Sequence, residues 1–123
     1  MSIAPHNIIV LAVVIFVSGC ATRSPQLYQW GSYEGLVYDM YTHPGKAEPG
    51  VQIIKLSEDI QRASAEGKRV APGIHAHLGY MYLIQGNSDS AVAEFTLERE
   101  LYPESTVFID GMLNRLSQNQ RTN

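Results

Sequence analysis

The chain of 123 residues contains a single cysteine, Cys20, so no disulfide can form within it and the fold must depend on packing. It lacks an apolar run of about twenty residues, the length that a helix needs to cross a bilayer. Its nine basic and twelve acidic residues all follow Cys20 and leave a net charge of −3. Since no basic stripe with interleaved aromatics is present, we do not expect a nucleic acid as partner.

Common catalytic and cofactor motifs are also missing. The sequence has no H-E-x-x-H, no G-x-S-x-G and no G-K-[ST] phosphate loop. His75 and His77 are two positions apart, which separates them by about 200° around a helix, so they do not face one metal ion together. We therefore expect no enzyme, no cofactor, no metal site and no small-molecule substrate.

The first twenty residues resemble a bacterial lipoprotein signal peptide. Ten apolar residues, from Ile8 to Val17, are followed by the small pair Ser18-Gly19 and by Cys20. The run has the length of a signal-peptide core, and a cysteine thiolate is a good nucleophile for taking up a lipid. The leading segment has no Lys or Arg, unlike an ordinary signal peptide. The alternative interpretation is a buried apolar strand that ends in a free cysteine.

This interpretation divides the chain into four parts. Residues 1–19 are the cleaved signal peptide, 20–27 a lipidated tether, 28–118 a helical domain and 119–123 a disordered tail. Acyl chains on Cys20, palmitate among them, anchor the protein in the membrane, since several chains bind far more stably than one. Lipoproteins of this kind that stay at the inner membrane often have Asp after the cysteine. Because Ala21 follows here, we expect the outer membrane, with the domain facing the periplasm.

Apolar residues of the domain recur at the helical period, which predicts an all-α fold of antiparallel helical hairpins. The first helix is predicted to bury one face made of Trp30, Tyr33, Val37, Met40 and Tyr41. A loop with two Pro-Gly pairs, residues 43–50, precedes a second helix that ends at Gly67. That helix is predicted to bury Ile53, Leu56, Ile60 and Ala63, with Asp59 on its other, solvent side.

Three more helices are predicted, over Ile74–Gln85, over Ser88–Tyr102 and after Ser105. The last is predicted to bury Phe108, Met112, Leu113 and Leu116. The acidic residues of the fourth helix, Glu94, Glu98 and Glu100, have no Asp/Gly-rich loop beside them and are interpreted as a solvated face.

Residues 72–105 match the tetratricopeptide pattern W-x₂-L-G-x₂-Y…A-x₃-F…P at every position but the first, where His75 stands. The matching positions are Leu78, Gly79, Tyr82, Ala91, Phe95 and Pro103. In this pattern the small residues mark where two helices touch, and the larger ones fill the space beside them. One repeat is not stable alone, so the Trp30 and Leu56 helices are interpreted as a degenerate second hairpin and the last helix as a cap.

The aromatic start Tyr28-Gln29-Trp30-Gly31-Ser32-Tyr33-Glu34, the nearby Tyr38 and the single late repeat resemble a family of short, uncharacterised bacterial lipoproteins. Its members are often encoded beside a lipoprotein resembling the curli-secretion channel protein. The resemblance implies a place in a cell-envelope assembly, with that neighbour as a partner, and carries no catalytic residues.

Candidate partner-binding residues follow from the repeat and from the crowded aromatics. They are Ala76, Tyr80 and Leu83, on the face that lines the groove in such repeats, and Tyr28 and Tyr38. The alternative is that the first three are core. We expect a membrane-anchored, non-enzymatic protein-binding adaptor; the alternative function is a structural subunit of an oligomeric envelope or secretion complex.

Overall fold

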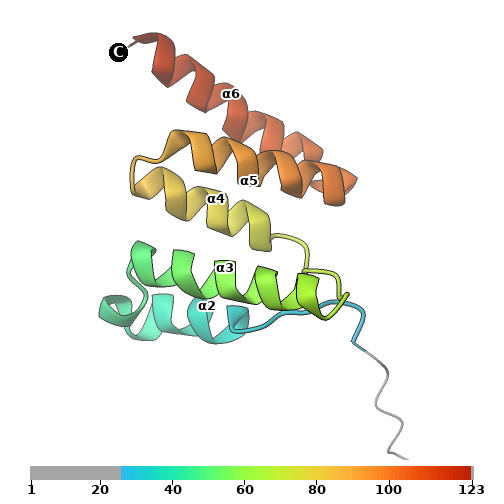
Figure 1. Cartoon of the computed structure of the whole chain (residues 1–123). Coiled ribbons are helices and arrows are strands. Elements are labelled where there is room, and N and C mark those ends of the chain that lie inside the picture. The colour runs from blue at the N-terminus through green and yellow to red at the C-terminus, as the bar shows by residue number, and fades with distance from the viewer. Residues whose placement is uncertain (1–25, 123) are drawn as a thin grey trace, which may run out of the picture.

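The computed structural model describes residues 26–122, which form five α-helices joined by short turns (Figure 1). The helices are α2 (Tyr33–Thr42), α3 (Pro49–Ala65), α4 (Ile74–Ile84), α5 (Ser88–Leu101) and α6 (Thr106–Thr122), with 3-10 turns at η2 (Pro44–Lys46) and η3 (Pro103–Ser105). This part of the chain contains no strand, only an isolated bridge between Gln29 and Val70. The predicted all-α fold is confirmed. The predictions for Cys20 and for the rest of residues 1–25 lie outside the described residues.

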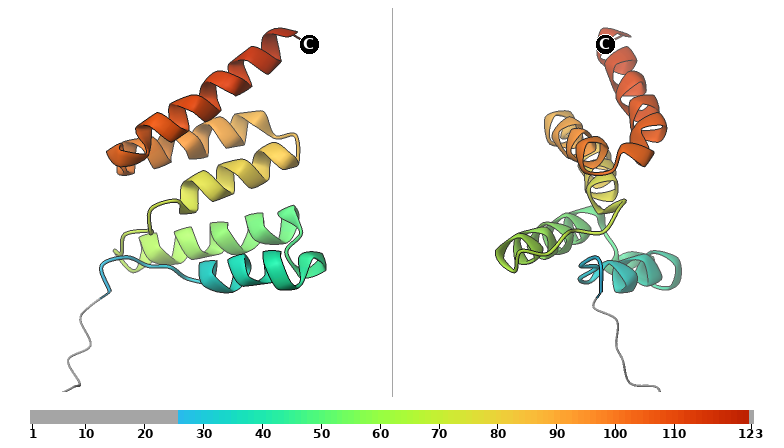
Figure 2. Two further views of the ribbon diagram at one scale, coloured as in Figure 1. Left: turned by 180° about the vertical axis from the view of Figure 1, so that it is seen from behind. Right: turned by 90° about the vertical axis from the view of Figure 1, so that its right-hand side faces the viewer.

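The helices stack in chain order, and each runs in the opposite direction to the one before it (Figure 1). When the right-hand side of the molecule in Figure 1 faces the viewer, α2 and α6 lie toward one side, α3 and α5 lie toward the other, and α4 lies between them (Figure 2, right). The central helix α4 therefore contacts α2, α3 and α5, and one of its sides faces the space between α2 and α6. No helix within residues 26–122 is long and apolar enough to span a bilayer.

The first core cluster joins α2, α3 and α4. Its buried members are Leu36, Leu56, Ala71, Ile74 and Leu78. Ile53 and Ile60 pack against it, and Ala63 is fully buried, which agrees with the face predicted for α3. Each of these aliphatic side chains contributes about 1.5–3 kcal/mol when fully buried, before entropy is counted.

The face predicted for the first helix was wrong at Trp30, Met40 and Tyr41, whereas Tyr33 packs against the first core cluster. Leu36 is the buried residue of α2, whereas Tyr41 is 83% exposed and Met40 is also exposed. Trp30 lies before the helix and is 44% exposed. The reason is that α2 is the first helix of the described stack, so only one of its sides meets a neighbour, and its aromatic residues outnumber the positions on that side.

The α4–α5 hairpin is the tightest contact in the stack. A Cβ added to Gly79 would lie 3.0 Å from two ring carbons of Phe95 and 3.1 Å from the Ala91 carbonyl oxygen. Ala91 and Phe95 are fully buried, and Tyr82 packs against both core clusters. The Asn87 side chain caps α5 by accepting a hydrogen bond from the Ser90 amide at 3.1 Å, and Pro103 follows the helix. The small residues thus let the two backbones approach.

The second core cluster joins α5 to α6. Its buried residues are Ala91, Phe95 and Ile109, with Met112, Leu113 and Leu116 packed against them. Phe108 was predicted to be on this face and is 60% exposed instead, because α6 turns Ile109 toward α5. The helix continues through Thr122 and so includes residues 119–122, which were predicted to lie in a disordered tail.

The described chain enters the fold through residues 26–30, which lie against the turn between α3 and α4. The Gln29 amide donates to the Arg69 carbonyl at 2.7 Å, and the Ala71 amide donates to the Gln29 carbonyl at 3.2 Å. These two backbone hydrogen bonds fix the start of the domain beside residues 66–71.

Candidate binding groove

The candidate site is a hollow of about 440 Å³ on the side shared by α2, α4 and α6, which we call the α2–α4 groove. It is lined by Tyr33, Val37, Met40, Tyr41, Gly73, Ala76, His77, Tyr80, Met81 and Phe108. Most of these side chains are apolar or aromatic, and none is a lysine, arginine, aspartate or glutamate. A charged group that entered the groove would lose water without gaining an ion pair from this lining, at a cost of several kcal/mol when fully buried. The groove therefore suits an uncharged, apolar segment.

One polar group of the groove, His77, is held in a defined form. The Gln52 amide nitrogen donates to the Ala47 carbonyl at 2.5 Å, which leaves the Gln52 side-chain oxygen as the acceptor for His77 Nε2, 2.8 Å away. Nε2 thus carries the proton, and Nδ1 is the acceptor nitrogen. Burial lowers the pKa of His77, so the ring is neutral at pH 7.

Tyr33 supports the same side of the groove. Its ring packs edge-on against the His77 ring, with centroids 5.5 Å apart, and it also contacts Trp30 at 5.9 Å. Burial, and secondarily the negative charge of Glu98, raises the pKa of the Tyr33 hydroxyl. It therefore stays protonated and can donate or accept a hydrogen bond.

The predicted partner-binding residues are distributed over four places. Ala76 and Tyr80 line the α2–α4 groove, and Tyr80 is 48% exposed. Leu83 packs against the Phe95 cluster instead, as does the other side of Ala76. Tyr28 packs against the first core cluster and meets Tyr102 edge-on at 6.2 Å. Tyr38 is exposed on α2, beside the ring of His43. The structure thus brings Ala76 and Tyr80 together and leaves the other three apart from them.

The interpretation of the acidic residues on α5 as a solvated face was wrong for Glu98. Its side chain is fully buried and accepts hydrogen bonds from the Gly73 amide at 2.8 Å, the Ala76 amide at 3.3 Å and the Ser105 hydroxyl at 3.2 Å. Gly73 and Ala76 lie at the start of α4, where backbone amides have no partner within the helix. Glu98 therefore caps α4 from a neighbouring helix and holds one wall of the groove.

Two further pairs of this kind were not foreseen. The Glu94 carboxylate accepts a hydrogen bond from the buried His75, whose Nδ1 lies 2.7 Å away. Asp59, predicted to face solvent, is buried and accepts both the amide and the hydroxyl of Ser32 at 2.6 Å. It thereby caps the start of α2, and its neighbour Arg62 lies 3.4 Å away. One signal was present in the sequence: Asp59 lies three positions after Leu56 and four before Ala63, which is the spacing of one helical face.

Two other hollows flank the segment through which the chain enters. The larger, of about 680 Å³, is lined partly by Gln26, Gln29, Glu34 and Arg62. The smaller, of about 310 Å³, includes Lys68 and Arg69. Both carry charged or polar walls, so the α2–α4 groove is the better site for an apolar protein segment. Within residues 26–122, no three His, Cys, Asp or Glu side chains are grouped as metal ligands.

The sequence profile of one protein family, described as Domain of unknown function (DUF4810), matches residues 27–112. The chain belongs to the DUF4810 family. The matched region begins just before the segment that contacts Arg69 and ends within α6, so the family domain contains every residue of the α2–α4 groove. No curated protein and no solved structure matches the chain. The description of the DUF4810 family names no activity, so a function has to be inferred from the groove itself.

Proposed function

We propose that this protein is a lipid-anchored, non-enzymatic adaptor that binds an uncharged segment of another cell-envelope protein in the α2–α4 groove. The observation that carries the proposal is the lining of that groove, in which exposed aromatic rings surround a hollow without a lysine, arginine, aspartate or glutamate side chain. Rings of this kind supply large contact areas at a small cost in side-chain entropy.

The arrangement of the helices supports a tetratricopeptide-like adaptor. Proteins with such repeats bind partners along the first helices of successive hairpins. Here α2 and α4 are the first helices of the α2–α3 and α4–α5 pairs, and both contribute to the groove. The close approach at Gly79 fits the small position of the repeat pattern.

The signal-like start of the sequence supports the anchor. Cleavage before Cys20 and acylation of its sulfur would confine the protein to a membrane, in our proposal the periplasmic face of the outer membrane. Confinement raises the effective concentration of a partner on the same surface, so a weak groove would suffice. The lipoprotein resembling the curli-secretion channel protein is the first partner to test.

The second candidate function is a structural subunit of an oligomeric envelope complex. It is favoured by Val107 and Phe108, which are 87% and 60% exposed at the beginning of α6. Native mass spectrometry of the acylated protein in detergent separates the two functions. A monomer supports the adaptor, and a stable oligomer that dissociates when Phe108 is replaced by Ser supports the subunit.

The groove is tested by replacing Tyr41 and Tyr80 with Ala together. Both side chains are exposed, so the domain should keep its helicity while capture of the curli-channel-like lipoprotein falls at least tenfold. The matched control replaces Ile54 and Val92, which are exposed on the outer sides of α3 and α5. Equal capture by the two double variants would show that the α2–α4 groove does not bind this partner.

A further inference from the structure

The end of the domain nearest to the proposed anchor carries basic and apolar side chains together. We propose that this end, formed by Leu27, Trp30, Lys68 and Arg69, docks on the anionic phospholipid headgroups of the membrane that holds Cys20. The inference rests on the lipid anchor of the proposed function and adds a second, non-covalent contact with the same bilayer.

The short segment between Cys20 and the domain limits how far this end can lie from the membrane. Six peptide steps separate Cys20 from Gln26, and a chain of that length spans at most about 22 Å however it is arranged. Gln29 is hydrogen-bonded to the Arg69 carbonyl and to the Ala71 amide, so the turn after α3 cannot move away from the anchored segment. An acylated Cys20 therefore keeps Lys68 and Arg69 close to the bilayer surface.

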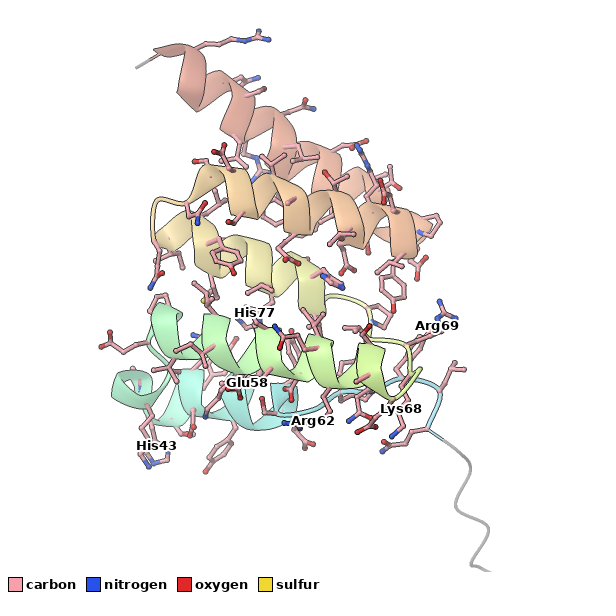
Figure 3. All side chains as sticks on the ribbon, in the orientation of Figure 1. His43, Glu58, Arg62, Lys68, Arg69 and His77 are labelled. Atoms are coloured by element: carbon pink, nitrogen blue, oxygen red, sulfur yellow. The ribbon has the colours of Figure 1, made fainter. Side chains whose placement is uncertain are left out.

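The cations at this end of the domain favour an anionic surface. Figure 3 shows Lys68 and Arg69 at the end of the domain where the described chain begins, with Arg62 nearer the middle and His43 at the opposite end. Arg62 is paired with Asp59 and Lys68 with Glu66, but no carboxylate of the described residues lies within ion-pair distance of Arg69. The Arg69 guanidinium instead lies 5.3 Å from the centre of the Tyr28 ring and 6.0 Å from that of Tyr102. Its charge is positioned by the two rings and remains available to an anion.

Two apolar side chains at this end are exposed to solvent. Leu27 is 71% exposed and Trp30 is 44% exposed, although both adjoin a well-packed core. Tryptophan and leucine beside basic residues are the composition of protein surfaces that lie in the headgroup region, where the indole prefers the boundary between water and hydrocarbon. In this orientation the helices stand on the membrane by their ends, and the α2–α4 groove opens sideways toward a partner.

Trp30 is the only tryptophan of the chain, so its fluorescence reports this contact directly. The mature, acylated protein is reconstituted into phosphatidylcholine vesicles that contain brominated phosphatidylglycerol, whose bromines quench nearby indoles. We expect strong quenching of Trp30. Quenching should fall when salt is raised from about 0.05 M to about 0.5 M, because surface charges are then screened. It should also be weaker when brominated phosphatidylcholine replaces the anionic lipid.

Replacing Lys68 and Arg69 with Gln should lower the ratio of docked to undocked protein by about thirtyfold, since each cation favours an anionic surface by about fivefold. The matched control replaces Lys46 and Lys55 with Gln; both are exposed and lie away from this end, and the change in net charge is the same. Quenching that is insensitive to lipid charge and to salt in the wild type, or equal in the two double variants, would overturn the inference while leaving the anchor intact. Absence of acyl chains on Cys20, detected by mass spectrometry, would overturn the anchor and this contact together.

Discussion

Gly79 on α4 faces the ring of Phe95 on α5 so closely that a Cβ at Gly79 would lie 3.0 Å from two of its carbons. Contacts of that length are tighter than almost all that real side chains make, and Phe95 is fully buried. The distance between α4 and α5 therefore depends on the absence of a side chain at position 79. Since α4 also forms the centre of the groove, the same contact sets the position of Ala76 and Tyr80.

Replacing Gly79 with Leu should lower the free energy of unfolding by about 1–3 kcal/mol, because overpacking forces the two helices apart. The control is Gly35→Ala on α2, where an added Cβ meets nothing within 4 Å. That variant should be more stable than the wild type by up to about 1 kcal/mol, since alanine favours a helix over glycine. Chemical denaturation of the three proteins measures both changes. A Gly79→Leu protein as stable as Gly35→Ala would contradict the proposed contact.

Replacing Glu98 with Gln should destabilise the domain by about 1–3 kcal/mol, although the side chain keeps its shape. Gly73, Ala76 and Ser105 donate to its two oxygens, so an amide nitrogen in either position would face a donor. Glu100→Gln is the control, since Glu100 is exposed on the same helix. It should change stability by less than about 0.5 kcal/mol. Thermal unfolding of the two variants side by side checks the difference, and equal melting temperatures would show that Glu98 is not the cap.

Replacing Gly31 with Ala should destabilise the domain more than the same change at Gly67. Both glycines have a positive φ, of 54° and 61°, which costs an alanine about 1–2 kcal/mol. An added Cβ at Gly31 would also collide with the Asp59 carboxylate, whereas at Gly67 it meets nothing within 4 Å. The excess loss in Gly31→Ala thus reports the contact between the start of α2 and Asp59. Equal losses in urea unfolding would mean that Asp59 yields freely and does not hold α2.

Stability should fall as the pH falls below about 6.5, and His77 should contribute to the fall. Burial lowers its pKa in the folded state, so below the ordinary pKa the unfolded chain binds a proton that the folded chain does not. The contribution begins near pH 6.5 and ends once the pH is below the lowered, folded-state pKa. His77→Gln removes this proton uptake, so its unfolding free energy should depend less steeply on pH across that window. If the unfolding free energies of the variant and the wild type change with pH in parallel, burial does not lower the pKa of His77.

Much of the helical layout could be predicted from the sequence because it depends on local patterns. The predicted third helix, Ile74–Gln85, differs from α4 by one residue, and Asn87 caps α5 as its position before Ser88 suggests. The repeat spacing also singled out Gly79, Ala91 and Phe95 before their contact was seen. Periods of three and four residues and turn-forming pairs carry this information within short segments.

The polar contacts could not be predicted, because each joins positions far apart in the chain. Ser32 and Asp59 are 27 positions apart, and Gly73 and Glu98 are 25 apart. A carboxylate within a helical sequence is more often solvated than buried, so only the packing shows which amide it meets. The predictions that Tyr41 and Phe108 are buried were wrong for a related reason. Phe108 and Ile109 are adjacent and similarly apolar, and the neighbouring helix decides which of them is buried.

Photo-crosslinking in living cells tests the proposed groove most directly. A benzoylphenylalanine placed at position 80 projects into the α2–α4 groove, whereas one at position 54 lies on the exposed side of α3. We expect the benzoylphenylalanine at position 80 to form a covalent adduct with an envelope protein, identifiable by mass spectrometry, and the one at position 54 to form none. Adducts of the same protein in equal yield at both positions, or an adduct at position 54 alone, would contradict it.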